Sequence, residues 1–253
     1  MAARPGVAAM EGVPLEGGNS NAPVRFGDRV HRVAGPWTPT VHAYLRHLRS
    51  HGVDLVPEPF GFDEQGREVL AFLPGAVPAY PLPEPVWSDA FLAQAAAVLR
   101  RLHDASVGFA PDDAVWQQPV REPVEVIAVN DFAPHNLVLD RDAITGVIDL
   151  DQAAPGPRVR DLAHLAYRLV PLTAPGNEDG RPTPIQERGR RLRLLAGAYG
   201  DVEPGAIAGA VGPLLDDLAE HAAARGLPDH AALYVGDAVH HRAALDAVLH
   251  GVG

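Results

Sequence analysis

Residues 124–151 contain three short apolar runs that are separated by acids, an amide and turn residues. The first run, 124–129, is rich in β-branched residues and leads directly into Asn130 and Asp131. Runs this short with many β-branched residues are typical of strands rather than helices. The stretch therefore predicts short strands that present polar side chains at their ends.

The N-terminal part of the chain has the pattern of a small antiparallel sheet with one helix. Gly27-Asp28 supplies the positive φ angle of a hairpin turn between two short segments. Apolar residues recur at i, i+3, i+4 and i+7 from Val41, and Thr38 offers an N-cap with Pro39 at the first helical position. The strands expected here are residues 23–26, 29–33, 60–62 and 69–73.

A proline-rich linker follows, and the pattern beyond it is mainly helical. Residues 78–85 hold four prolines, which interrupt both strands and helices, so we expect a boundary between two lobes near this run. Ser88 can cap a helix that extends to about Ala105. Three later helices are expected to begin at Pro184, Pro204 and Pro228. We expect residues 1–10 to be disordered, residues 11–75 to form a nucleotide-binding N-lobe and residues 76–253 to form a C-lobe.

The composition argues against several classes of partner. Among 253 residues, 21 basic and 32 acidic side chains give a formal net charge of −11, which opposes a general attraction to nucleic acid or anionic lipid. No apolar run approaches the roughly 18 residues that span a bilayer, and residues 1–10 lack the apolar core of a signal peptide. The absence of cysteine excludes disulfides and thiolate chemistry. We therefore expect a cytoplasmic protein that binds neither nucleic acid nor a membrane.

Asp131, Asn136 and Asp149 have a spacing that suits phosphoryl transfer. One carboxylate would orient the acceptor hydroxyl or accept its proton, while a second carboxylate and an amide oxygen would hold Mg²⁺, which prefers hard oxygen ligands. Asp and Asn in loops also form turns without any catalytic role, and for any single one of these residues that interpretation is the stronger. The whole set, placed between three apolar runs, favours a phosphotransferase site.

Several other polar residues are interpreted as structural. His103, His135 and His164 show no zinc-ligand spacing, so packing or hydrogen bonding is the favoured role. Asp161, near the start of an expected helix, is interpreted as a cap or a loop anchor. No Gly-x-Ser-x-Gly turn and no Walker phosphate loop is present, which leaves serine hydrolase and P-loop chemistry without support.

The chain resembles a known family from about residue 15 to residue 172, which is most of its length, and five segments carry the resemblance. The matching segments are residues 15–21, 99–104, 130–136, 147–151 and 161–163. On these segments the chain resembles the aminoglycoside phosphotransferase family, and it is most similar to a bacterial subgroup labelled trifolitoxin-immunity-like. The resemblance implies an α+β, bilobal protein-kinase-like fold, with a small antiparallel-sheet N-lobe that carries one helix and a larger, mainly helical C-lobe.

The resemblance also implies roles for individual residues. It makes Asp131 the residue that positions or deprotonates the acceptor hydroxyl, and Asn136 and Asp149 the Mg²⁺ ligands. It places Arg32, on an expected strand, toward the α- and β-phosphates of the nucleotide. The remaining nucleotide-binding residues are a loop over the phosphates, Gly17, Gly18, Asn19, Ser20 and Asn21, and the hinge backbone at Phe72 and Leu73.

Three positions depart from the family pattern. Val129 stands where the family commonly has a histidine, two residues before the catalytic Asp. Arg32 replaces the usual lysine, and His42 stands where a glutamate on the first helix would pair with it. Because arginine and histidine do not form an ion pair at neutral pH, we expect Arg32 to be less constrained, with weak activity as one outcome.

The leading functional hypothesis is Mg²⁺-dependent transfer of the γ-phosphate of ATP or GTP to a hydroxyl of a small molecule, such as an aminoglycoside-like antibiotic or a metabolite. The helices after residue 184 would shape the acceptor pocket, where Asp216, Asp217 and Glu220 would favour a cationic acceptor. The chain would act as a monomer or homodimer. Two alternatives stay open: a kinase-like binding or immunity protein that sequesters a toxin or antibiotic, and a metal-dependent phosphohydrolase that uses no nucleotide.

Overall fold

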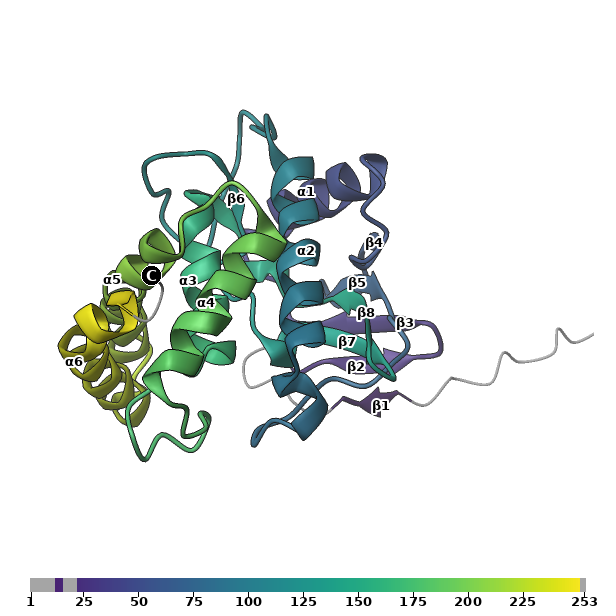
Figure 1. Ribbon diagram of the computed structural model, residues 1–253. Helices are drawn as coiled ribbons and strands as arrows, with labels where there is room; N and C mark the ends of the chain where they lie inside the picture. The colour runs from purple at the N-terminus through teal and green to yellow at the C-terminus, as the bar shows by residue number, and fades with distance from the viewer. Residues whose placement is uncertain (1–11, 16–21, 251–253) are drawn as a thin grey trace, which may run out of the picture.

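A computed structural model of the protein describes residues 12–15 and 22–250. The disorder expected for residues 1–10 and the phosphate loop expected at 17–21 concern residues outside this range. The described chain forms a small sheet with one helix and a larger, mainly helical part (Figure 1). The α+β, two-lobed fold predicted from the sequence is confirmed.

The N-lobe contains an antiparallel sheet with the strand order β1-β2-β3-β5-β4. Its strands are β1 (Val13–Pro14), β2 (Val24–Phe26), β3 (Arg29–Arg32), β4 (Pro59–Phe62) and β5 (Glu68–Ala71). The four predicted strands are confirmed, as is the hairpin turn at Gly27, where φ is 62°. The two-residue strand β1 was not predicted, because it is too short to show alternation. The register places Arg32 on β3 directly opposite Glu68 on β5.

Helix α1 (Thr38–Ser50) packs against β4 and α2. The apolar face that the sequence predicts is buried and consists of Val41, Tyr44, Leu45 and Leu48. The predicted N-cap is wrong by one residue, since Trp37 is the N-cap and Thr38 is the first helical residue. Thr38 still fixes the entry to the helix, because its Oγ1 accepts a hydrogen bond from Gly35 N at 2.9 Å.

The C-lobe is built around five helices in the described part of the chain. They are α2 (Asp89–Ser106), α3 (Arg158–Leu169), α4 (Ile185–Tyr199), α5 (Pro204–Ala224) and α6 (Pro228–His250), with short 3₁₀ turns η1 (Glu84–Trp87), η2 (Pro134–Asn136) and η3 (Leu150–Gln152). The predicted cap of α2 is confirmed, since Ser88 Oγ accepts a hydrogen bond from Phe91 N at 3.2 Å. The proline starts are confirmed as well, with Pro184 as the N-cap of α4. Figure 1 shows α2 in the middle of the molecule and α5 beside α6 at the left.

Two short antiparallel ribbons carry the middle of the chain. Strand β6 (Val126–Ala128) pairs with β9 (Ala154–Gly156), and β7 (Leu137–Asp140) pairs with β8 (Ala143–Val147). The strands expected within 124–151 are therefore confirmed, whereas β9 was not predicted. An isolated bridge between Ala76 and Leu139 ties the chain after β5 to the β7–β8 ribbon. The proline-rich linker thus begins in contact with the ribbon that carries the polar residues.

One connected cluster of buried apolar side chains extends from α1 to α6. The inner face of α3 has no exposed surface and consists of Leu162, Leu165, Ala166 and Leu169. Tyr44 of α1 also donates a hydrogen bond to Ile127 O on β6, at 3.5 Å. The N-lobe helix and the C-lobe therefore share one core.

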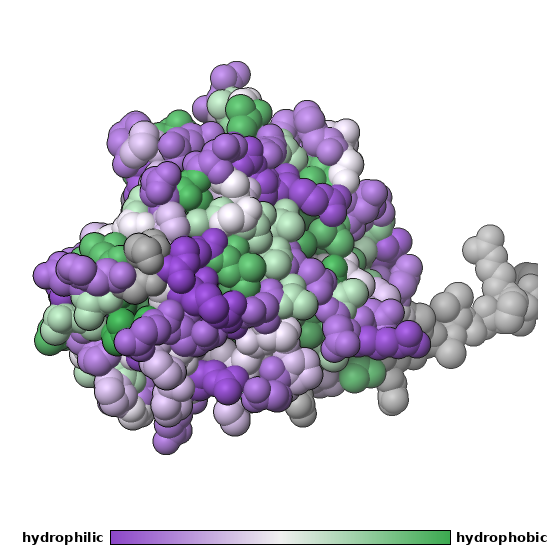
Figure 2. All heavy atoms as spheres, in the orientation of Figure 1, coloured by the Kyte–Doolittle hydropathy of each residue, from purple (hydrophilic) through white to green (hydrophobic). Residues whose placement is uncertain are grey.

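Among the described residues, no helix combines the length and the apolarity needed to cross a bilayer. Figure 2 shows hydrophilic and hydrophobic residues interspersed over one face of the molecule. Exposed large apolar side chains come from different elements, such as Phe62 on β4, Val107 after α2 and Val239 on α6. Single apolar residues of this kind are ordinary on protein surfaces.

Replacing Leu165 by Ala is expected to lower the free energy of unfolding by about 2–5 kcal/mol, because the side chain is completely buried and its loss leaves a cavity. Denaturant unfolding followed by circular dichroism measures this loss. The matched control is Leu227→Ala, because Leu227 is 41% exposed and its truncation should cost less than about 0.5 kcal/mol. Equal losses in the two variants would contradict the central position of α3 in the core.

Candidate functional site

Asn136 and Asp149 meet at one end of the β7–β8 ribbon. Leu137 pairs with Val147, and Ile148 N donates a hydrogen bond to Asn136 O at 2.9 Å. Asp149 follows at once, in a left-handed backbone conformation with φ 59° and ψ 55°. That conformation is uncommon for residues other than glycine, and it turns the chain from the ribbon into η3. The residues between Asn136 and Asp149 in the sequence therefore form one hairpin, which brings both residues to the same end of the ribbon.

Asp131 is held next to Asn136 by a short turn. The 3₁₀ turn η2 folds the chain back, so that Asn136 Nδ2 donates to Asp131 O at 2.9 Å and to Asp131 Oδ2 at 3.1 Å. The structure thus brings together the three polar residues that the sequence singled out. Among the described residues, no group of three or more His, Asp and Glu side chains has the arrangement of a metal site. An ion at this position would depend on the amide oxygen of Asn136 as well as on a carboxylate.

A buried carboxylate anchors the loop of residues 129–136, here called the Asp131 loop. Asp161, on α3, has no exposed surface and accepts hydrogen bonds from Val129 N at 2.6 Å and Asn130 N at 2.7 Å. It also lies 2.9 Å from His103 Nε2, and His103 Nδ1 lies 2.7 Å from the hydroxyl of Tyr199. The interpretations of Asp161 as a loop anchor and of His103 as a hydrogen-bonding residue are confirmed. Helices α2, α3 and α4 therefore position this loop jointly.

Asn130 supplies a polar link that Val129 does not. Val129 is buried in the apolar cluster. Asn130 has a left-handed backbone with φ 63°, and its Nδ2 donates to Gln152 O at 2.9 Å. Its Oδ1 accepts a hydrogen bond from Arg160 Nε at 2.7 Å. The Asp131 loop is therefore tied to η3 and α3 without a histidine at position 129, a role that an Asn beside an Asp in a loop does not reveal in the sequence.

Arg32 lies in an ionic cluster between β3 and the C-lobe. Its Nη1 is 2.8 Å from Asp149 Oδ1, its Nη2 is 2.5 Å from Asp151 Oδ1, and its Nε is 2.5 Å from Glu68 Oε1. Burial acts to lower the pKa of this guanidinium, but the three carboxylates outweigh burial and raise the pKa above its usual value. Arg32 therefore stays charged and is oriented from three sides.

The expectation that Arg32 is poorly constrained is wrong. Glu68 on β5 stands between Arg32 and His42, with its Oε2 2.9 Å from His42 Nε2. The cross-strand register that puts Glu68 opposite Arg32 supplies the acidic partner that the first helix lacks. The sequence did not reveal Glu68, because it precedes the expected strand at 69–73 and strand register cannot be read from a local pattern.

Two histidines flank the carboxylate of Asp131. His164 Nε2 lies 3.9 Å from Oδ1 and His135 Nε2 lies 3.9 Å from Oδ2, beyond hydrogen-bond length. Burial acts to raise the pKa of Asp131, but these histidines and Arg168 outweigh burial and lower it. Burial lowers the pKa of His164 to about 4, so this imidazole is neutral at neutral pH. An ionised carboxylate therefore stands beside a neutral imidazole.

The predicted hinge follows β5. Phe72 N donates to Asp28 O at 2.8 Å, and the Arg25 guanidinium lies 3.7 Å from the centroid of the Phe72 ring. Leu73 N has no hydrogen-bond partner among the described residues. The Leu73 side chain fills the space beside Gly146 on β8, where an added Cβ would lie 2.7 Å from Leu73 Cδ1. The hinge therefore packs directly on the β7–β8 ribbon.

The predicted phosphate loop, residues 17–21, lies outside the described residues. Its described flanks are joined, because Leu15 N donates a hydrogen bond to Pro23 O at 2.9 Å. Beside this bond, Pro14 on β1 pairs with Val24 on β2. The two flanking segments therefore lie side by side at the edge of the sheet.

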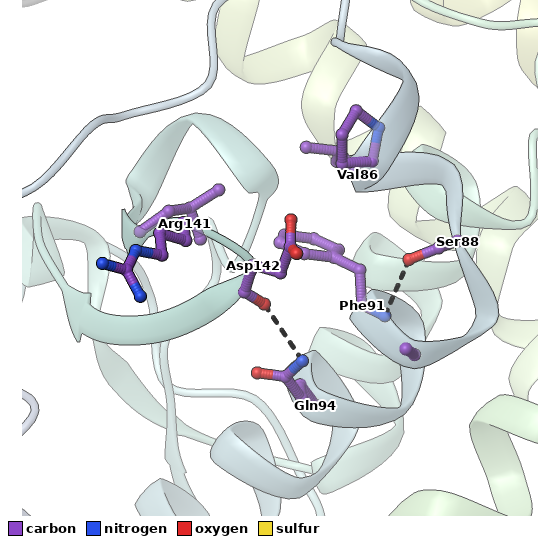
Figure 3. A pocket seen from close by; sticks show the side chains of 9 residues that line it. Val86, Ser88, Phe91, Gln94, Arg141 and Asp142 are labelled. Carbon is purple, nitrogen blue, oxygen red and sulfur yellow. Dashed lines mark hydrogen bonds between the residues drawn. The ribbon is translucent and has the colours of Figure 1, made fainter.

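A cavity of about 370 Å³ lies between the start of α2 and the β7–β8 turn (Figure 3). Polar groups on its wall are engaged with one another, since Gln94 Nε2 donates to Asp142 O at 3.1 Å and Ser88 caps α2. None of the residues that the sequence singled out for chemistry lines this cavity. It is therefore separate from the site around Asp131.

Comparisons with known proteins agree with this arrangement. A family model described as "Phosphotransferase enzyme family" matches residues 112–193. The trifolitoxin immunity protein of Rhizobium leguminosarum bv. trifolii is 33% identical over 198 residues, which are 74% of this chain and 73% of that protein.

Solved structures with a similar fold include small-molecule kinases. The gentamicin complex of APH(2")-IIa has a TM-score of 0.62 and 14% identity, covering 90% of this chain and 91% of that one. An ethanolamine kinase of Plasmodium vivax has a TM-score of 0.61 and 13% identity, covering 92% and 81%. Macrolide 2'-phosphotransferase MphH of Brachybacterium faecium has a TM-score of 0.53 and 17% identity, covering 90% of each chain.

The fold is that of the kinase-like phosphotransferases. The chain belongs to the aminoglycoside phosphotransferase family, in the subgroup of the trifolitoxin immunity protein.

Acidification is expected to destabilise the protein because of His164. Its pKa of about 4 in the folded protein lies below the ordinary 6.5, so the unfolded chain binds more protons between these values and stability falls as the pH falls through them. The full difference corresponds to about 3 kcal/mol of unfolding free energy. Thermal unfolding of the wild type and of His164→Asn, compared at about pH 7.5 and pH 4.5, measures it. The variant should lose less stability on acidification, and an identical loss would assign the effect to other groups.

Proposed function

We propose that the protein transfers the γ-phosphoryl group of ATP or GTP to a hydroxyl of a small molecule. The observation that carries this proposal is the meeting of Asp131, Asn136 and Asp149 at one end of the β7–β8 ribbon. Phosphoryl transfer requires little covalent chemistry from the protein, so positioning and charge stabilisation by preorganised groups supply most of the catalysis. Membership of a phosphotransferase family supports the proposal.

Asp131 is oriented to receive the acceptor. Asn136 Nδ2 holds its Oδ2, whereas Oδ1 accepts no hydrogen bond from a described group. An acceptor hydroxyl that donates to Oδ1 would be aligned for attack on phosphorus, and its proton would pass to the carboxylate as the new bond forms. Because the pKa of Asp131 is lowered, the carboxylate is a weak base. Its main contribution is therefore orientation of the hydroxyl.

The oxygen atoms of Asn136 and Asp149 fit a magnesium site. Asn136 Nδ2 faces Asp131, which turns Oδ1 away from it, and Asp149 Oδ2 has no partner among the described residues. Mg²⁺ prefers such oxygen ligands and is commonly held by one or two protein groups together with water and phosphate oxygens. When bound, the ion would neutralise charge on the phosphates.

Arg32 and the hinge are the proposed nucleotide contacts, together with the loop at 17–21. Arg32 contacts Asp149, so its guanidinium stands beside the proposed ion site, where it can bind phosphate oxygens through two donors. Leu73 N has a free hydrogen among the described residues and can bind the nucleotide base. Structures of the kanamycin complex of APH(2")-IIIa with GDP and of the streptomycin complex of APH(2")-IIa with ATP support a nucleotide ligand.

Asp131→Asn is expected to lower the rate of phosphate transfer at least about 100-fold, because the hydroxyl loses its oriented acceptor. Nucleotide binding should be nearly unchanged, since the proposed nucleotide contacts lie on other residues. Transfer is measured by release of the nucleoside diphosphate in the presence of acceptor, and binding by thermal shift. Turnover at the wild-type rate would remove Asp131 from its proposed role.

Mg²⁺ is expected to strengthen nucleotide binding through Asp149. ATP or GTP with Mg²⁺ should raise the melting temperature of the wild type, because a ligand that binds only the native state stabilises it. In Asp149→Asn the nucleotide-induced increase should be smaller, and Mg²⁺ should no longer enhance it. Asp140→Asn, at the opposite end of the same ribbon, is the matched control and should behave as the wild type. An unchanged Mg²⁺ effect in Asp149→Asn would contradict the ligand assignment.

A second candidate function is sequestration of a toxin or antibiotic without chemical change. Two observations favour it. A relative at 33% identity is named an immunity protein, and Arg32 forms ion pairs with Asp149 and Asp151 in the described structure. Mass spectrometry of a candidate ligand after incubation with the protein, Mg²⁺ and ATP separates the two functions. Only the phosphotransferase adds the mass of a phosphoryl group, whereas a sequestering protein returns the ligand unchanged.

A further inference from the structure

Four buried polar atoms near Asp131 have no hydrogen-bond partner among the described residues. They are Arg168 Nε, His164 Nδ1, His135 Nδ1 and the hydroxyl oxygen of Tyr80. They come from α3, from η2 and from the linker before η1, so segments distant in the sequence place them together. Buried polar groups in folded proteins are nearly always hydrogen-bonded to protein, water or ligand. Their gathering marks a polar subsite beside the proposed acceptor hydroxyl.

Distances to Asp131 and its neighbours define this subsite. The two histidines each place Nε2 at 3.9 Å from an oxygen of Asp131. The ring of Tyr80 lies 5.8 Å from that of His135, measured between centroids. The guanidinium carbon of Arg168 lies 5.5 Å from the centroid of the same Tyr80 ring. Tyr80 therefore bridges Arg168 and His135, and the group lies on one side of Asp131.

Arg168 is the cation of the subsite. It follows His164 by four residues on α3, so both side chains lie on the same face of the helix. Its side chain is only 8% exposed; Nη1 lies 3.1 Å from Asp179 Oδ2, and Nη2 lies 3.5 Å from the hydroxyl of Tyr234. A guanidinium has five donor hydrogens, so these two contacts leave capacity for an anion. The unpartnered Nε is part of that capacity.

Two of the three acids expected to attract a cationic acceptor, Asp216 and Asp217, are engaged in ion pairs. Asp217 Oδ2 lies 3.1 Å from Arg121 Nε and 2.6 Å from Arg160 Nη1, and Asp216 pairs with Arg242. Arginines therefore already offset the charges of Asp216 and Asp217, whereas Glu220 has no ion pair among the described residues.

We propose that the acceptor carries an anionic group, such as a carboxylate, next to the hydroxyl that is phosphorylated, and that Arg168 binds this group. The proposal rests on the proposed function, because it concerns the second substrate of the same site. The Tyr80 hydroxyl and the two imidazoles would complete the hydrogen bonds of the anion. Arginine suits this role because its planar fork can bind both oxygens of a carboxylate.

The reaction at this site balances as an ordinary phosphoryl transfer. The acceptor hydroxyl oxygen forms a bond to the γ-phosphorus of the nucleoside triphosphate. The bond between that phosphorus and the β–γ bridging oxygen breaks, and the nucleoside diphosphate leaves with the electron pair. The hydroxyl proton passes to Asp131. The anionic group is unchanged and serves to hold the hydroxyl at Asp131 Oδ1.

Two matched series of acceptors test the proposal with the wild-type protein. Glycerate, glycerol and 3-aminopropane-1,2-diol differ only in an anionic, neutral or cationic end, and gluconate, glucitol and glucamine repeat the comparison on a longer chain. With Mg²⁺ and ATP, mass spectrometry measures the phosphorylated product. The anionic member of at least one series should react about 10- to 100-fold faster than the neutral member, the effect expected for hydrogen bonds to a charged group. Equal rates, a faster cationic member, or no product from either anionic member overturns the proposal.

Arg168→Met should abolish the preference for the anionic acceptor, with a loss in kcat/KM on the order of 10- to 100-fold. The matched control is Arg181→Met, which removes an arginine that pairs with Glu84 on the surface and should keep the preference. Arg168→Lys retains the charge without the fork and should keep part of the preference, so it provides the test if the methionine variant does not fold. An undiminished preference in Arg168→Met, or in Arg168→Lys if the methionine variant does not fold, overturns the proposal.

ATP hydrolysis in the absence of acceptor separates failure of this proposal from failure of the proposed function. If the protein hydrolyses ATP with Mg²⁺ but phosphorylates neither anionic acceptor, the anion proposal fails and the phosphotransferase proposal stands. If ATP is neither bound nor hydrolysed, the proposed function fails. In that case a thermal shift with gluconate alone tests the anion subsite. An increase in melting temperature that gluconate causes in the wild type and that is lost in Arg168→Met supports the subsite. Any other result overturns it.

Discussion

The shape of the site depends on the burial of one carboxylate, that of Asp161. A charge without exposed surface is tolerated only where hydrogen-bond donors surround it. The donors here are two successive amides of the Asp131 loop and an imidazole from α2. Asp161 can be buried only if the loop turns both amides toward it, and the left-handed backbone of Asn130 is part of that turn. The packing of α2 and α3 and the shape of the loop therefore depend on each other.

A second ionic group joins the sheet to the C-lobe. Arg32 reaches Asp149 and Asp151 across the lobes, while Glu68 holds it from the neighbouring strand. Three carboxylates around one guanidinium leave an excess of negative charge, which favours the arrival of a further cation. Under the proposed function, Arg32 would release Asp149 and turn to phosphate oxygens. A metal cation would then take the place of the guanidinium at Asp149, so this carboxylate would keep a positively charged partner.

Local patterns in the sequence were sufficient for most of the fold and for part of the site. Periodicity and prolines located the helices, and motif spacing located Asp131, Asn136 and Asp149, because these three lie within one hairpin and its flank. Contacts between distant segments were not predictable in the same way. Glu68 became the partner of Arg32 through strand register, and the surroundings of Asp131 depend on how α3 packs against the linker. Strands as short as β1 and β9 show no alternation to detect.

Gly146 on β8 has no side chain, and this allows the hinge to pack close to the β7–β8 ribbon. Leu73 occupies the space that a Cβ at position 146 would need, so the backbone proposed to face the nucleotide base rests on β8. Asp149 lies three residues further along the same chain, roughly 10 Å if extended. A larger residue at position 146 would require the Leu73 side chain to move, and it would also crowd the Val138 side chain. The close packing of the hinge on the ribbon therefore depends on the lack of a side chain at this one position.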